Sequence, residues 1–197
     1  MNKTVNPHTA PVRQLLEQAT TLLPSDTARL DAEVLLAHVL GKARSHLHAW
    51  PEKVLSAEQQ ARFRQLLQAR VRGEPVAYLT GQREFWSLPL CVTPATLIPR
   101  PETETLVALA LELIPPDSPA LVADLGTGSG AIALAIAHER PHCHVLATDI
   151  SPAAIEIAAA NARQLEIGNI EFHRGDWCAP LAGRHCDMIV SNPPYIR

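Results

Sequence analysis

The 197-residue chain has little of what marks membrane, secreted or repeat proteins. No apolar run reaches the roughly 18 residues that a membrane-spanning helix needs, and the first ten residues are too polar for a secretory signal. The chain also contains no internal repeat and no low-complexity tract. Hydrophobic residues make up 47% of it, which is enough for a sizeable core. A chain of this length forms one large domain or two small ones.

The cysteines and the charges also lack patterns that would assign a function. None of the four cysteines stands in a C-x-x-C pair, which favours reduced thiols in a cytoplasmic protein. The segment His142–His144 has no second ligand pair at zinc-finger spacing, so we expect no metal site. The net charge is −3, and no block of Lys or Arg supplies the basic footprint of sequence-independent nucleic-acid binding. We therefore expect no membrane binding and no direct nucleic-acid binding.

The N-terminal part of the chain has the pattern of a small helical bundle. Apolar residues recur at helical spacing in Val12–Leu23, in residues 26–40 and in residues 56–72. Ser56 and Gln59 form a capping box at the start of the last of these helices. The apolar residues of such helices are far more typical of a core than of a ligand site.

The next region contains extended segments. Two short runs, Arg83–Trp86 and Pro89–Val92, are separated by two residues, as in a β-hairpin. The stretch Thr93–Pro101 then holds three prolines, which exclude a helix and make the backbone stiff. We expect a hairpin followed by a rigid loop that folds back on a pocket.

Strands and helices alternate over the remainder of the chain. An amphipathic helix at Glu102–Ile114 precedes four predicted strands, which are Leu121–Leu125, His144–Asp149, Ile170–Arg174 and Cys186–Ser191. Such alternation predicts a parallel sheet with right-handed crossovers. The expected fold class is α/β, with a Rossmann-like parallel sheet preceded by a small all-helical domain and a β-hairpin linker.

The segment Leu121–Ala131 is a short apolar strand that runs into three alternate glycines and then into a helix. Glycines let the backbone approach a ligand closely, and a ligand lies at the carboxyl end of such a strand. The spacing is G-x-G-x-G and not the G-x-G-x-x-G of dinucleotide-binding folds, which favours S-adenosylmethionine over NAD. Asp124 is a carboxylate inside a strand of the buried type, so it needs a partner, and a cationic ligand such as a sulfonium would supply one, directly or through ordered water.

Acidic residues follow the next two strands. Asp149 comes about 20 residues after the glycines, where an acid binds the ribose hydroxyls of an adenosine-containing cofactor. Alternatively, it caps the next helix. Asp176 can accept a hydrogen bond from an adenine amino group while Trp177 covers the ring. Packing of a buried Trp177 under a loop explains this pair nearly as well.

The motif Asn192-Pro193-Pro194-Tyr195 directly follows the fourth predicted strand. An amide or exocyclic amine nitrogen is a poor nucleophile, because its lone pair is delocalised. Acceptors for both N–H groups can hold that lone pair towards a methyl donor, and the Asn192 carbonyl and a main-chain carbonyl of the two prolines are suitable. Tyr195 offers a flat face to a planar group. We therefore predict methyl transfer that depends mostly on alignment, although the motif alone also suits an ordinary turn.

Together, these motifs resemble those of a known family. Asp124–Gly130 with Asn192–Tyr195 is similar to the amino-group branch of the class I S-adenosylmethionine-dependent methyltransferases. Four further segments closely resemble the bacterial peptide chain release factor N5-glutamine methyltransferases, and they are Ala28–Leu36, Gly73–Gly81, Glu84–Leu90 and Leu97–Glu104. The resemblance implies methyl transfer from S-adenosylmethionine to the glutamine nitrogen in the Gly-Gly-Gln loop of translation release factors.

The resemblance also implies roles for single residues and regions. The catalytic residues would be Asn192, Pro193, Pro194 and Tyr195. The cofactor would contact Gly126, Thr127, Gly128, Ser129, Gly130, Asp149, Trp177 and Asn192. Arg100, Glu102 and Glu104 would belong to the loop that shapes the cofactor pocket. Residues 1–73 would recognise the substrate protein, residues 74–101 would form the linker, and residues 102–197 would bind S-adenosylmethionine.

Members of that family continue beyond this motif and complete a seven-stranded sheet. The resemblance therefore implies a methyltransferase domain that is C-terminally incomplete here, truncated after its fourth strand. Two other functions stay open: an amino methyltransferase acting on a nucleic-acid base, such as rRNA guanine or DNA adenine, and a truncated, non-catalytic docking module. The glycine spacing disfavours an NAD-dependent dehydrogenase.

Overall fold

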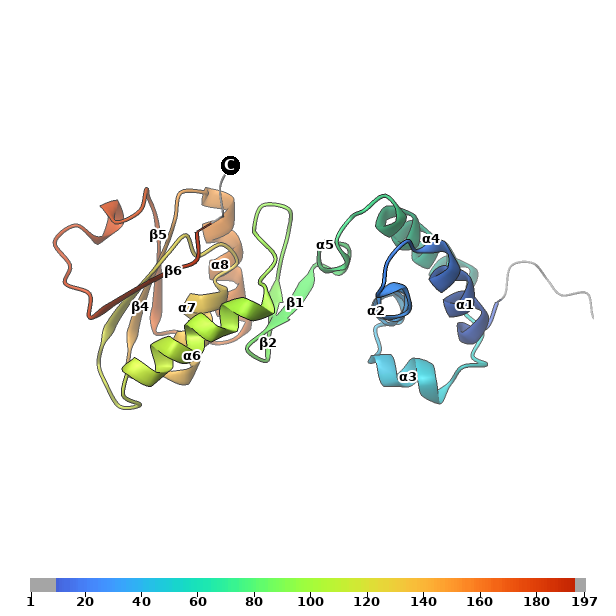
Figure 1. Ribbon diagram of the computed structural model, residues 1–197, viewed down its shortest axis with the longest axis horizontal. Coiled ribbons are helices and arrows are strands. Elements are labelled where there is room, and N and C mark those ends of the chain that lie inside the picture. Colours follow the sequence, from blue (N-terminus) through green and yellow to red (C-terminus); the bar gives the residue numbers. More distant parts are fainter. Residues whose placement is uncertain (1–9, 194–197) are drawn as a thin grey trace, which may run out of the picture. The chain divides into compact units, whose positions relative to one another are not determined.

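The computed structural model describes residues 10–193, which form two compact units that divide after Thr80 (Figure 1). The first unit is helical, and the second contains the strands. Within residues 10–193, no helix is both long enough and apolar enough to cross a lipid bilayer.

The helices of the first unit are α1 (Val12–Leu22), α2 (Ala28–Leu40), α3 (Arg44–Ala49), α4 (Ala57–Val71) and α5 (Val76–Thr80). Their apolar faces meet in one core, which includes the fully buried Leu35 and Phe63. The predicted capping box is confirmed. The Gln59 N–H donates to Ser56 Oγ at 3.2 Å, and the Ser56 N–H donates to Gln59 Oε1 at 3.0 Å.

A buried carboxylate in this unit is paired with cations. Glu33 is 4% exposed, and its two oxygens lie 2.7 Å from Arg29 Nε and 3.0 Å from Arg44 Nη2. Burial acts to raise the pKa of Glu33, but the hydrogen bonds from the two arginines outweigh it, so the pKa lies below its usual value. Asp31 is paired in the same way with Arg70 Nε at 2.8 Å.

The second unit begins with a hairpin of β1 (Gln82–Phe85) and β2 (Leu88–Cys91). The elements that follow are η1 (Pro101–Thr103), α6 (Glu104–Leu113), β3 (Leu121–Leu125), α7 (Ala131–Glu139), β4 (His144–Asp149), α8 (Pro152–Gln164), β5 (Ile170–Arg174), η2 (Ala179–Leu181) and β6 (Met188–Ser191). The last four strands form one sheet in the order β5-β4-β3-β6, and every neighbouring pair is parallel. The predicted α/β class and parallel sheet are confirmed.

The predicted second and third strands are confirmed to the residue, whereas other boundaries shift. The fourth strand begins at Met188 and not at Cys186. Trp86 was expected in a strand, but Trp86 and Ser87 form the hairpin turn, with φ of 52° and 59°. A turn of this kind normally carries Asn or Gly, so its sequence signal is missing here. The predicted helix at Glu102 starts instead with a 3₁₀ turn, in which the Thr103 N–H donates to the Arg100 carbonyl.

Helices α6, α7 and α8 lie on one face of the sheet (Figure 1), where they share a core with Val122, Val145 and Val190. The other face carries Leu125 and Leu146, which pack with Leu181 of η2, the last residue of that short helix. Because the strands are parallel, their carboxyl ends lie at one edge of the sheet. A ligand crevice is expected at this edge.

Candidate functional site

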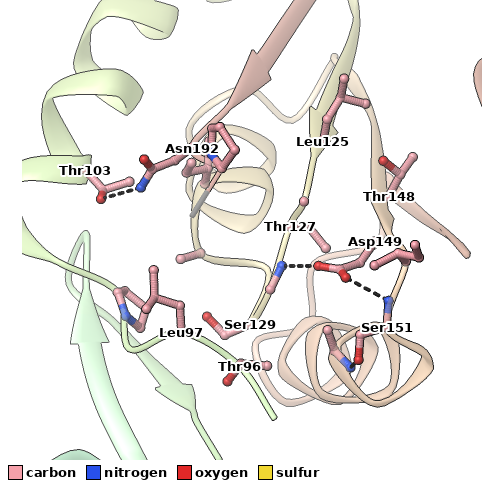
Figure 2. A pocket seen from close by; sticks show the side chains of 18 of the residues that line it. Thr96, Leu97, Thr103, Leu125, Thr127, Ser129, Thr148, Asp149, Ser151 and Asn192 are labelled. Atoms are coloured by element: carbon pink, nitrogen blue, oxygen red, sulfur yellow. Dashed lines mark hydrogen bonds between the residues drawn. The ribbon is translucent and has the colours of Figure 1, made fainter. Parts of the chain in front are cut away.

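A cavity of about 450 Å³ lies at the carboxyl edge of the sheet (Figure 2). All four strands of the sheet contribute residues to it where they end. Gly126–Ser129 follow β3, Asp149 ends β4, Trp177 comes shortly after β5, and Asn192 follows β6. The structure therefore brings most of the predicted site residues to one cavity. Pro193 lines it too, whereas Pro194 and Tyr195 lie outside the described residues.

The three glycines have two different functions in the loop. All have positive φ, of 75°, 57° and 85° for Gly126, Gly128 and Gly130. A Cβ added to Gly126 or Gly128 would meet no atom within 4 Å, so both positions face open space. At Gly130 a Cβ would lie 2.9 Å from Leu134 Cδ1 and 3.1 Å from Ala158 Cβ. Gly130 does not line the cavity, and it permits close packing of α7 against α8.

Asp124 has a partner other than the one expected for it. Its side chain is buried, and its Oδ2 accepts a hydrogen bond from the Thr127 hydroxyl at 2.7 Å. Oδ1 accepts none within the described residues. Burial raises the pKa of Asp124 to about 6, while the Thr127 hydroxyl and the Ala133 N–H act to lower it. Since neighbouring strand residues point to opposite faces, Leu125 lines the cavity and Asp124 does not, which corrects the expectation of direct contact between Asp124 and a cationic ligand.

Asp149 organises the backbone around the cavity. Its Oδ2 accepts a hydrogen bond from the Gly128 N–H, and its Oδ1 accepts one from the Ser151 N–H, both at 2.9 Å (Figure 2). The helix cap itself is Ser151, whose Oγ accepts from the Ala154 N–H at 3.3 Å. Asp149 thus ties the glycine loop to the start of α8. Each of its oxygens retains a lone pair that can accept a ligand hydroxyl.

The Asn192 amide is held by a residue that the sequence analysis did not select. Asn192 Nδ2 donates to Thr103 Oγ1 at 3.0 Å (Figure 2). Its Oδ1 accepts no hydrogen bond from the described residues. The two residues are 89 positions apart, and nothing in either local sequence signals the contact.

Trp177 lies at the surface of the cavity. Its side chain is 59% exposed, so the alternative of a Trp buried under a loop is wrong. Its φ of 43° is unusual for a bulky residue. A Cβ at the preceding Gly175 would overlap the Pro180 ring, so this turn after β5 is tightly determined. Asp176 lines the same cavity.

The stiff segment between the hairpin and α6 forms a further wall of the cavity. Thr96, Leu97 and Arg100 line the cavity, which agrees with the prediction that this stiff loop folds back on a pocket. Glu104 does not line it. Its carboxylate accepts a hydrogen bond from the Trp86 N–H at 2.9 Å and so holds the strained hairpin turn.

The cavity offers three kinds of chemistry to a ligand. At one end, the glycine turn lies beside the Asp149 carboxylate. The exposed apolar side chains of Leu97, Ile150 and Trp177 lie at the rim. At the end formed by β6, the Asn192 amide oxygen can accept a hydrogen bond. Such a cavity can hold a nucleoside-like ligand and orient a neighbouring N–H donor.

Comparisons with known proteins agree with this arrangement. Residues 14–81 match the family described as PrmC N-terminal domain, and residues 105–197 match the one described as methyltransferase small domain. A release factor glutamine methyltransferase of Aliivibrio fischeri is 52% identical over 180 residues, which are 91% of this chain and 63% of that protein. One of Coxiella burnetii is 53% identical over 184 residues, 93% of this chain and 66% of that protein.

Among solved structures, the chain resembles a ribosomal protein L11 methylase from Lactobacillus delbrueckii subsp. bulgaricus. The identity is 34% and the TM-score is 0.42, over 48% of this chain and 47% of that one. The chain spans slightly less than two thirds of the length of the two curated relatives, 63% and 66%.

Proposed function

Because the chain belongs to the family of release factor glutamine methyltransferases, we propose that it methylates a peptide chain release factor. The methyl group of S-adenosylmethionine would pass to the side-chain amide nitrogen of the glutamine in the Gly-Gly-Gln motif. The observation that carries this proposal is the shared cavity, which the glycine turn after β3 and Asn192 after β6 line together (Figure 2).

The residues of the cavity suit S-adenosylmethionine. Bound there, the cofactor supplies an activated methyl group on a sulfonium. Gly126 and Gly128 leave space beside the backbone for its amino-acid part, and Asp149 can accept its ribose hydroxyls. Ile150 and Trp177 are exposed apolar surfaces for its adenine ring.

Asn192 would orient the substrate nitrogen. An amide N–H₂ group has two donors, and Asn192 Oδ1 can accept one of them while a main-chain carbonyl of the following prolines accepts the other. Asn192 Nδ2 donates to the Thr103 hydroxyl, and this orients the Asn192 amide so that its Oδ1 can accept from the substrate. The two acceptors would hold the planar amide with its lone pair towards the methyl group, and alignment supplies most of the rate enhancement. Stacking of the amide on Tyr195 stays a prediction.

The regions outside the cavity would deliver the substrate protein. We assign residues 1–73 to recognition of the release factor, residues 74–101 to the linker that shapes the pocket, and residues 102–197 to cofactor binding. Since release factors act in translation, the proposed location is the cytoplasm.

Mass spectrometry of a release factor after incubation with the chain and S-adenosylmethionine tests the proposal. We expect one added methylene unit on the glutamine of the Gly-Gly-Gln motif, and no addition when that glutamine is replaced by alanine. A parallel incubation with ribosomal RNA and labelled cofactor separates the alternatives. Label in RNA alone would contradict the protein substrate, and the absence of cofactor binding would support a non-catalytic docking module.

A further inference from the structure

Asn161 of α8 is a buried amide that joins two distant segments of the second unit. The residue has 0% exposure. Its Oδ1 accepts from the Cys91 N–H at 2.8 Å, and its Nδ2 donates to the Cys91 carbonyl at 3.0 Å and to the Ser129 carbonyl at 2.8 Å. Both amide N–H donors are therefore used, as expected of a buried polar group.

The two segments that Asn161 joins lead directly into two walls of the cavity. Ser129 belongs to the glycine loop and lines the cavity. Cys91 ends β2, and the stiff stretch that follows it supplies the lining residues Thr96 and Leu97. Asn161 itself does not line the cavity. It can affect a ligand only through these two backbone segments.

The glycine loop needs such external support. Gly126 and Gly128 have no side chains that could anchor the loop, so other groups hold it, among them the Thr127 hydroxyl, which donates to Asp124, and the Gly128 N–H, which donates to Asp149. Helix α8 approaches it closely, since Ala158 lies where a Cβ at Gly130 would make contact. Asn161, almost one helical turn further on, adds the polar link to the loop.

We propose that Asn161 is a positioning residue that sets the glycine loop and the wall after β2 in the geometry that binds the cofactor. The ligand in this inference rests on the proposed function, whereas the network of hydrogen bonds does not. Because the two walls share one amide, loss of that amide should loosen both.

The variant Asn161→Ala removes all three hydrogen bonds, and Asn169→Ala is its matched control. Like Asn161, Asn169 makes three hydrogen bonds to the backbone: its Nδ2 donates to the carbonyls of Ala137, Arg140 and Cys143, at 3.0 to 3.1 Å. These three carbonyls lie at the C-terminal end of α7 and in the turn before β4, at the end of α7 far from the cavity, and Asn169 itself directly precedes β5. Both variants lose an amide that bridges backbone segments, so both should lower the melting temperature.

Only the Asn161 variant should affect the site. Calorimetry with S-adenosylmethionine is expected to give an about tenfold higher Kd for Asn161→Ala and a Kd within about twofold of the original chain for Asn169→Ala. Hydrogen exchange of the ligand-free chain should show faster exchange of the Thr127 and Gly130 amides in Asn161→Ala alone. Those amides donate to the Thr148 and Thr127 carbonyls, both at 2.9 Å.

An unchanged Kd and unchanged loop exchange in Asn161→Ala would overturn the inference, as would equal losses in the Asn169 control. Should circular dichroism show that Asn161→Ala is unfolded, Asn161→Ser replaces it, with the same expected direction. If the original chain does not bind S-adenosylmethionine, the proposed function fails. The exchange comparison without ligand then still decides whether Asn161 positions the loop.

Discussion

The carboxylates inside the two units have different partners. In the helical unit, Glu33 and Asp31 are each paired with arginine at 3.0 Å or less. In the sheet unit, Asp124 and Asp149 accept hydrogen bonds from a hydroxyl and from backbone N–H groups, and no cation pairs with either in the described residues. The carboxylates of the first unit are neutralised by arginine, whereas those beside the glycine turn have no cation as a partner in the described residues.

This difference separates structural from functional polar groups. A carboxylate paired with arginine has its charge compensated within its own unit, and removal of one partner leaves the other charge without compensation. Asp149, which lines the cavity and is held by N–H donors, fixes the backbone while its charge remains, and this suits a site proposed to bind a sulfonium cofactor. Loss of a paired carboxylate in the helical unit should therefore alter stability and leave cofactor binding unchanged, whereas changes of the residues that line the cavity should alter binding or chemistry.

The largest effect on chemistry is expected for Asn192→Ala. Without the side-chain carbonyl the substrate amide loses an acceptor, so kcat should fall by about 100-fold or more. Any loss of cofactor affinity should be at least about tenfold smaller than the loss in kcat. Steady-state kinetics on a release factor, with calorimetry for the cofactor, measures both. A loss of cofactor affinity with an unchanged kcat at saturating cofactor would place Asn192 in cofactor binding alone.

Asp124 should give the sheet unit a stability that falls as pH rises. Its folded-state pKa is raised from 3.8 to about 6, so the folded state holds a proton that the unfolded chain releases. Stability from this group is full below about pH 4 and is lost as pH rises through 6, by about 3 kcal/mol. Urea unfolding from pH 4 to 8 measures it. Asp124→Asn cannot ionise, and a variant with the same pH slope would contradict the assignment.

Glu33 should show the opposite pH dependence in the helical unit. Because its folded-state pKa is lowered, its contribution is present above pH 4.5 and is lost as pH falls through the lowered value. Glu33→Gln should cost about 2 kcal/mol at pH 7, since Arg29 and Arg44 lose their partner but are half-exposed and can be hydrated. Cofactor affinity should not change in this variant. A weaker affinity of Glu33→Gln for the cofactor would contradict the proposed difference between structural carboxylates in the helical unit and functional ones in the sheet unit.

The smallest effect is expected for Thr103→Val. The Thr103 hydroxyl binds Asn192 Nδ2 and so leaves Asn192 Oδ1 to accept from the substrate. Without the hydroxyl, the amide can rotate by about 180°, which should reduce kcat about tenfold. Thr103→Ser keeps the hydroxyl and should restore most of the rate. Equal rates in the valine and serine variants would show that packing matters at this position and the hydrogen bond does not.

The sequence predicted those parts of the molecule that depend on local patterns. Alternating apolar strands and helices were enough for the parallel sheet, and β4 and β5 match their predicted bounds. The glycine spacing and the motif after the fourth strand located both ends of the cavity, because parallel strands end at one edge.

Contacts between distant segments could not be predicted from such patterns. Thr103 holds Asn192 across 89 residues, and Asn161 reaches Cys91 across 70, and neither stands in a recognisable motif. Asp124 was interpreted as a buried carboxylate that needs a ligand, although its partner, Thr127, lies three residues away in the loop. Strand alternation placed it on the helix side of the sheet, and this was the overlooked signal.

The pairing of β3 with β6 limits how this part of the chain can vary in length. Leu125 and Ser191 are partners in the parallel register, and the Ser191 hydroxyl donates to the Leu125 carbonyl at 2.8 Å. The next residues are Gly126 and Asn192, at the two ends of the cavity. A single inserted residue in β6 would turn Asn192 to the other face of the sheet. Homologous chains should therefore tolerate insertions between β5 and β6 and reject them within β6.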